Sequence, residues 1–114
     1  MISRVWRGRA AAAAADEYEA FLRRTAYPDY GDVEGNKGWI LLRRDLADCA
    51  EFMFVSFWDS MDAVHRYAGV EAEQPKYYAE DRAALLELPE RADLYAVIDA
   101  VTDLPGSGHA PTDG

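Results

Sequence analysis

The chain has 114 residues, a length that suits one domain with a single modest core, and half of its residues are hydrophobic. Its 21 acidic and 12 basic residues give a formal net charge of −9. Nucleic acid and anionic membranes are therefore poor partners, because both repel an acidic surface. No apolar run is long enough to cross a bilayer, and the first ten residues lack the layout of a secretion signal, so we expect a cytoplasmic protein. Cys49 is the single cysteine, which excludes an internal disulfide and a cysteine metal cluster.

The first half of the chain predicts a strand, a helix and a loop. Residues 2 to 8 alternate in type, which is typical of a strand. The alanine-rich residues 10 to 25 predict a helix, because alanine is the best helix former and Tyr18 and Leu22 fall on one face. Proline and glycine within residues 26 to 38 predict a loop.

A hairpin of two apolar strands is expected next. Residues 39 to 45 and 51 to 58 read as its two strands. Both faces of the second strand are bulky and apolar, so we expect helices to cover one face and a second subunit the other. Alternation places these four side chains on one face: Phe52, Phe54, Ser56 and Trp58.

The second half of the chain predicts two helices and a last strand. Asp59 or Ser60 can cap a helix that Gly69 ends. Residues 79 to 88 predict a short helix, and the alternation of residues 93 to 101 predicts a strand.

The element order is thus strand, helix, strand, strand, helix, strand. This is the ferredoxin-like βαββαβ arrangement, an α+β fold with an antiparallel sheet covered by helices on one face. The bare face would expose large apolar side chains, so we expect a homodimer that presses two sheets together. Residues 1 to 101 form this single domain, and the small, polar residues 102 to 114 are expected to be a disordered tail.

Three features together resemble the antibiotic-biosynthesis monooxygenase family of dimeric α+β barrel proteins. They are the strand order, the Trp-Asp-Ser step at residues 58 to 60 and the Gly-Asn-Lys-Gly entry to the second strand at residues 35 to 38. The resemblance covers residues 2 to 101, and it looks closest to a bacterial group with a YY-x-ED segment, here residues 77 to 81. It implies an oxidoreductase, a monooxygenase that oxidises an electron-rich, polyketide-like aromatic with O2 and no cofactor.

In such an enzyme the deprotonated ring itself passes an electron to oxygen. The protein must bind the ring, help to remove a proton and exclude water. Trp58 matches the family's Trp at the end of the third strand, whereas Phe54 and Val64 stand where the polyketide enzymes have Asn and Tyr. These two departures favour an alternative, a non-catalytic ligand-binding or accessory protein of the same fold.

Haem binding is a further alternative. A second branch of the family degrades haem, and here Tyr67 and Tyr77 stand at or near the positions of its Trp and its iron-ligating His. A haem-binding protein of this sequence would instead use His65 as the ligand.

The candidate site residues lie at the end of the second hairpin strand and after it. His65 and Trp58 are the candidate catalytic residues, His65 as the base and Trp58 as a wall of the pocket beside the reacting ring. Arg82 is a candidate for holding an enolate or phenolate oxygen. The rings expected to bind the aromatic substrate are Phe54, Tyr67, Tyr77 and Tyr78.

Each of these residues also has a plain structural interpretation. His65 would then be a half-buried helix residue with one hydrogen bond, and Trp58 a core residue whose N–H needs a partner. The Tyr77–Tyr78 pair would pin a loop, and Arg82 would be a solvated ion-pair partner. No motif for a metal or a phosphate is present, so no metal is expected.

Overall fold

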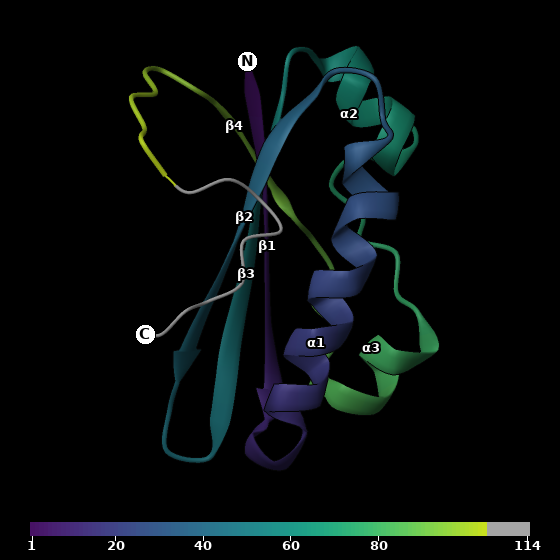
Figure 1. The fold of residues 1–114 in the computed structure, drawn as a ribbon. Coiled ribbons are helices and arrows are strands. Elements are labelled where there is room, and N and C mark those ends of the chain that lie inside the picture. Colours follow the sequence, from purple (N-terminus) through teal and green to yellow (C-terminus); the bar gives the residue numbers. More distant parts are fainter. Residues whose placement is uncertain (105–114) are drawn as a thin grey trace.

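The computed structural model describes residues 1–104 and shows an antiparallel sheet with its helices on one face (Figure 1). The strands are β1 (Ile2–Ala11), β2 (Asn36–Asp45), β3 (Cys49–Trp58) and β4 (Asp93–Ala96), in the spatial order β2-β3-β1-β4. The helices are α1 (Ala15–Ala26), α2 (Met61–Ala68) and α3 (Ala79–Ala84), with a 3-10 turn η1 (Ala12–Ala14) and a wide turn η2 (Tyr27–Gly31). This order confirms the ferredoxin-like α+β prediction, with α3 added in the connection from α2 to β4.

The central strand β1 is longer than the alternation of residues 2 to 8 predicted. Ala10 and Ala11 pair with Ala50 and Cys49 of β3, and α1 begins only at Ala15. The prediction of a helix from residue 10 is therefore wrong at its start. Pairing along the whole of β3 outweighs the weak helix preference of each alanine, and Ala10 is completely buried in the core.

Strand β3 has the two faces that its alternation predicted. Phe52, Phe54, Ser56 and Trp58 are all buried on the face that the helices cover. Met53, Val55 and Phe57 alternate with them and are half-buried. The inner face of β3 thus forms the floor of the core.

The region predicted as a loop begins with helical structure. Helix α1 runs on into η2, a turn of the wider π type that contains Pro28. The loop prediction is wrong here because proline suits the first turn of a helix, where its missing N–H is not needed. The turn buries the ring of Tyr30 against Phe54 and Trp58, with ring centroids 5.4 and 6.0 Å away.

Helix α2 starts and ends where the sequence predicted. The Ser60 hydroxyl accepts a hydrogen bond from the Ala63 N–H at 3.2 Å, and Gly69 ends the helix with φ +85°. Gly35, at the entry to β2, also has positive φ, and a Cβ there would lie 2.5 Å from the Cβ of Ala63. A glycine is therefore required where the β2 entry passes the start of α2.

The last helix and strand are shorter than predicted. Helix α3 ends at Ala84 because the Leu85 and Leu86 region leaves it to pair with β1, through the Leu86 N–H and the Arg9 carbonyl. Strand β4 pairs with β1 only over Asp93–Ala96. Strand β4 begins opposite Val5, and its last residue, Ala96, pairs with Ile2, the first residue of β1. The chain then leaves the sheet because β1 offers no further residue to pair with.

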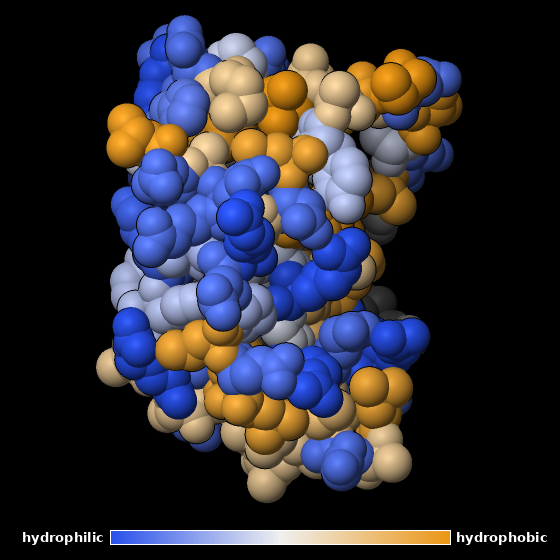
Figure 2. Space-filling view, turned by 180° about the vertical axis from the view of Figure 1, so that it is seen from behind, coloured by the Kyte–Doolittle hydropathy of each residue, from blue (hydrophilic) through white to orange (hydrophobic). Residues whose placement is uncertain are grey.

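The segment that follows β4 projects from the body of the molecule (Figure 1). Ile98 and Val101 are each 93% exposed, and apolar residues lie at the tip of this projection in Figure 2. The prediction of a disordered tail concerns mainly residues 105–114, which lie outside the described residues. Within residues 1–104, no helix combines the length and the apolar character needed to span a membrane.

Candidate functional site

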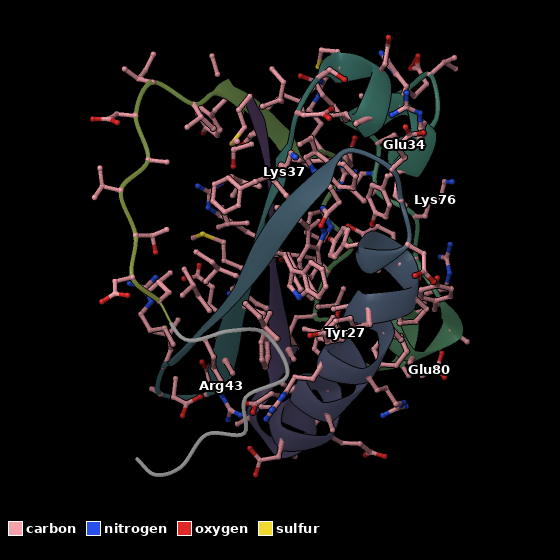
Figure 3. All side chains as sticks on the ribbon, turned by 45° about the horizontal axis from the view of Figure 1, so that its top comes forward. Tyr27, Glu34, Lys37, Arg43, Lys76 and Glu80 are labelled. Atoms are coloured by element: carbon pink, nitrogen blue, oxygen red, sulfur yellow. The ribbon has the colours of Figure 1, made fainter. Side chains whose placement is uncertain are left out.

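A cavity lies between the inner face of the sheet, helix α1 with η2, helix α2 and residues 75 to 78. It leaves about 60 Å³ of space open to water, enough for only a few water molecules. In Figure 3 the side chains fill the layer between sheet and helices, and Lys76 lies at the outer edge of this layer. Half of the lining residues are aromatic, and they are Trp6, Tyr18, Phe21, Tyr30, Phe54, Tyr67, Tyr77 and Tyr78.

Three stacked and tilted rings make the inner end of this cavity. The ring of Tyr67 on α2 stacks on Trp58, with centroids 5.4 Å apart and planes at 25°. Tyr30 from η2 packs against the same Tyr67 ring at 4.8 Å. Buried ring area and ring–ring electrostatics stabilise these contacts, so Tyr30 and Trp58 hold the Tyr67 ring in place at the cavity wall.

Arg4 of β1 brings a positive charge to the same end of the cavity. It is only 4% exposed, and its guanidinium carbon lies 5.3 Å from the centroid of the Tyr67 ring. Its Nε donates to the Ala72 carbonyl at 2.9 Å, and one terminal nitrogen, Nη2, donates to the Gln74 carbonyl at 3.4 Å. These bonds hold the side chain in place, and within residues 1–104 no carboxylate lies at ion-pair distance from it.

Two carboxylates also line the cavity, Asp81 from α3 and Asp29 from η2. Asp81 is buried and accepts the Tyr18 O–H at 2.6 Å and the Tyr78 N–H at 2.8 Å. Asp29 is half-buried and accepts the Tyr78 O–H at 3.0 Å. The wall thus carries two acceptors as well as the buried Arg4 guanidinium and the exposed Lys76.

The phenols that line the cavity are held in their neutral form. Burial is the main cause that raises the pKa of Tyr18, Tyr30, Tyr67 and Tyr77 above the usual value of 10.0. The charge of Arg4 lowers the pKa of Tyr67 in part but does not cancel the effect of burial. At neutral pH these hydroxyls therefore carry protons. Tyr18 already donates its proton to Asp81, and Tyr77 donates its proton to the Pro89 carbonyl, which leaves Tyr67 as the phenol best placed to donate to a ligand.

The structure brings most of the predicted ring-binding residues together. Phe54, Tyr67, Tyr77 and Tyr78 all line the cavity. Trp58 lies behind Tyr67, completely buried, and its N–H donates to the Ser56 hydroxyl at 2.9 Å. Its role as a pocket-shaping residue stays a prediction, with the contact to a ligand made through the Tyr67 ring.

The two predicted polar residues do not line the cavity. His65 is exposed on α2, and its Nδ1 lies 2.9 Å from the Gly69 carbonyl. Arg82 is exposed and lines a separate open groove between residues 70 to 77 and 88 to 94. The assignments of His65 as base and Arg82 as oxyanion partner stay predictions, but neither side chain contacts the cavity wall.

Sequence reasoning missed Arg4, Tyr30, Asp29 and Asp81. Tyr30 and Asp29 lie in the region that was predicted to be loop, and Asp81 was named only as part of the YY-x-ED segment. A signal for Arg4 was present, because strand alternation places it on the same face as the buried Trp6. A lone charge on the inner face of a strand is unusual and indicates a specific use.

No family model and no curated protein matches the sequence. The structure is similar to the crystal structure of a proposed antibiotic biosynthesis monooxygenase from Bacillus cereus, with a TM-score of 0.61 and 10% sequence identity. The match covers 90% of this chain and 97% of that chain. The fold expected from the family resemblance is therefore confirmed, and the chain shares the fold of that protein over nearly its whole length.

Proposed function

We propose that this protein binds a flat, electron-rich aromatic molecule in the cavity and oxidises it with O2 without a cofactor. The observation that carries the proposal is the cavity wall itself, in which flat rings meet neutral phenol donors and one buried cation. Such a wall can hold an aromatic ring, orient its oxygen substituents and exclude water, as this reaction requires.

The reaction needs no external reductant. A ring that has lost a proton passes electrons to O2, and one oxygen atom becomes a carbonyl at the oxidised carbon. The other oxygen leaves as water with the two hydrogens that this carbon loses. The part of the protein is therefore to bind the ring, accept one proton and keep the ring dry.

Asp29 is the proton acceptor that we propose within the cavity. It is the less buried of the two carboxylates in the wall, and the Tyr78 hydroxyl orients it at 3.0 Å. Asp81 is less suitable, because Tyr18 and the Tyr78 backbone already occupy both of its oxygens.

A second candidate function is ligand binding without turnover. Both carboxylates in the cavity wall already accept hydrogen bonds, and the predicted base His65 lies outside it. A site with strong binding groups and little free basic capacity favours an accessory or ligand-binding protein.

We also propose that the protein acts as a homodimer. The face of the sheet opposite the helices carries Met53, Val55 and Phe57, and the projecting segment exposes Ile98 and Val101. A second copy that packs on this face would cover both sets of apolar residues. Sedimentation of the intact chain over a range of concentrations tests this proposal.

Oxygen uptake with a panel of anthrones, dihydroxynaphthalenes and hydroquinones tests the enzyme proposal. A metal chelator in every reaction removes contributions from free metals, and Asp29→Asn and His65→Ala run beside the wild type. Uptake that falls in Asp29→Asn and persists in His65→Ala supports the proposal. Oxygen uptake that falls only in His65→Ala would identify His65, and not Asp29, as the proton acceptor. Ligand binding without uptake supports the second candidate, and a new visible absorbance band on addition of hemin would support haem binding.

A further inference from the structure

We infer that the ligand of this cavity is a single aromatic ring bearing an ionised oxygen, and that Arg4 recognises this oxygen. The inference rests on the proposed function for the location of the site, but it concerns binding and does not require turnover. It assigns the charge and the size of the ligand, neither of which the oxidation chemistry fixes.

Arg4 differs from the other arginines of β1. Arg7 and Arg9 are exposed, and each pairs with a carboxylate, at 3.1 and 2.8 Å. Arg4 is buried, and within residues 1–104 it has only two backbone carbonyls and the face of Tyr67 as partners. A buried guanidinium without a counter-ion is costly, so an incoming anion would gain an interaction that the protein itself does not provide.

One terminal nitrogen of Arg4, Nη1, makes no hydrogen bond within residues 1–104. The two hydrogen bonds of the side chain use Nε and Nη2, which leaves Nη1 without a partner in residues 1–104. No buried side-chain nitrogen or oxygen in this part of the chain lacks a hydrogen-bond partner, so Nη1 is accessible. Because Arg4 lines the cavity, its unused N–H groups are available to a bound oxygen.

Tyr67 adds a phenol next to Arg4. The centroid of its ring lies 5.3 Å from the guanidinium carbon, and burial raises its pKa, so the phenol is neutral at physiological pH. The carboxylates Asp29 and Asp81 also line the cavity, and Tyr18 and Tyr78 already hydrogen-bond them. Because these carboxylates repel an anion, a ligand fits with its anionic oxygen at Arg4, and a neutral hydroxyl of the ligand can face Asp29.

The size of the cavity favours a small ligand. Its open space of about 60 Å³ is below the roughly 150 Å³ cavity in which benzene binds, so even one ring requires outward movement of wall residues such as the half-exposed Tyr78. A single ring needs less of this movement than a tricyclic polyketide does. Phenolates and benzoates are the single-ring anions that combine a flat face with a charged oxygen.

Matched small ligands test the inference without any turnover. Quenching of tryptophan fluorescence reports binding, because Trp6 lines the cavity and Trp58 stacks on Tyr67. Benzoate is compared with benzamide, which has the same shape and no charge. The absorbance of 4-nitrophenol reports directly whether the bound phenol is ionised. The variants are Arg4→Gln, Arg4→Lys and the control Arg7→Gln, which changes an exposed arginine of the same strand.

We expect wild type and Arg7→Gln to prefer benzoate over benzamide by about ten- to a hundredfold, and Arg4→Gln to lose this preference. Arg4→Lys should keep part of it. Binding should lower the pKa of 4-nitrophenol by about one unit or more in the wild type. Selectivity for 4-nitrophenolate alone identifies a phenolate ligand, and selectivity for benzoate alone identifies a carboxylate.

Equal affinity of the wild type for benzoate and benzamide, with 4-nitrophenol bound in its neutral form, would overturn the inference even if Arg4→Gln does not fold. Absence of binding by every anionic probe would also overturn it. Anion-selective binding without oxygen uptake leaves this inference standing and removes the oxygenase proposal. Equal oxygen uptake with neutral and anionic rings would support the oxygenase proposal and contradict the inference that Arg4 selects an anion.

Discussion

The hydrogen bond between Tyr18 and Asp81 is expected to be a main stabilising link between α1 and α3. It joins two side chains that are 2% and 6% exposed, and its length of 2.6 Å is in the range of charge-assisted O–H···O⁻ bonds. Hydrogen bonds to charged groups contribute about 1.5–3 kcal/mol. Tyr18→Phe leaves one oxygen of the buried carboxylate without this donor, so we expect a loss of about 2–3 kcal/mol in the free energy of unfolding.

A double-mutant cycle isolates this contribution. Tyr18→Phe, Asp81→Asn and the double variant are unfolded in urea, and their free energies are obtained by linear extrapolation. We expect a coupling energy of about 1 kcal/mol or more, because Tyr18→Phe removes the donor and Asp81→Asn removes the charge of the acceptor. Tyr78→Phe is the matched control, since it removes another Tyr–Asp bond, to Asp29, whose tyrosine is 50% exposed. Its loss should stay below about 1 kcal/mol. Single-variant losses that simply add up would refute the reasoning.

Three further outcomes are expected. The free energy of unfolding should fall above about pH 10. Folding raises the pKa of Tyr18 and of the other buried phenols, so above that pH only the unfolded chain releases these protons. Tyr18→Phe should flatten this fall by up to about 1.4 kcal/mol per pH unit in urea unfolding, and an unchanged slope would contradict it. Gly35→Ala should lower the free energy of unfolding by about 3 kcal/mol, since positive φ and the contact with Ala63 act together. Gly69→Ala, with positive φ but open space around it, should lose only about 1 kcal/mol, and equal losses would refute the contact argument. His65→Ala should leave the benzoate affinity of the cavity unchanged, because its ring contacts Gly69 outside it; a weakened affinity would place His65 at the site.

The core and the α2 boundaries could be predicted from sequence because their signals are local. Alternation along β3 identifies Phe52 and Trp58 as inward-facing, and both are completely buried. The cap at Ser60 and the stop at Gly69 each depend on the chemistry of one residue. These features need no knowledge of what the rest of the chain does.

The features that were missed depend on distant partners. Ala10 is a strand residue because Ala50 lies opposite it, and no local propensity reveals that pairing. Tyr30 belongs to the site because a helical turn through Pro28 carries its ring onto Tyr67. His65 was given a catalytic role from its residue type alone, but the helix phase turns its ring outward to the Gly69 carbonyl.

The cavity wall described above is formed by residues that lie between Arg4 and Asp81 of a single chain. A site built in this way should bind its ligand independently of assembly. Ligand titrations should then saturate at one ligand per chain with a hyperbolic curve, and dilution that separates the copies should leave the dissociation constant unchanged. A dissociation constant that changes on dilution would show that a second copy contributes to the wall.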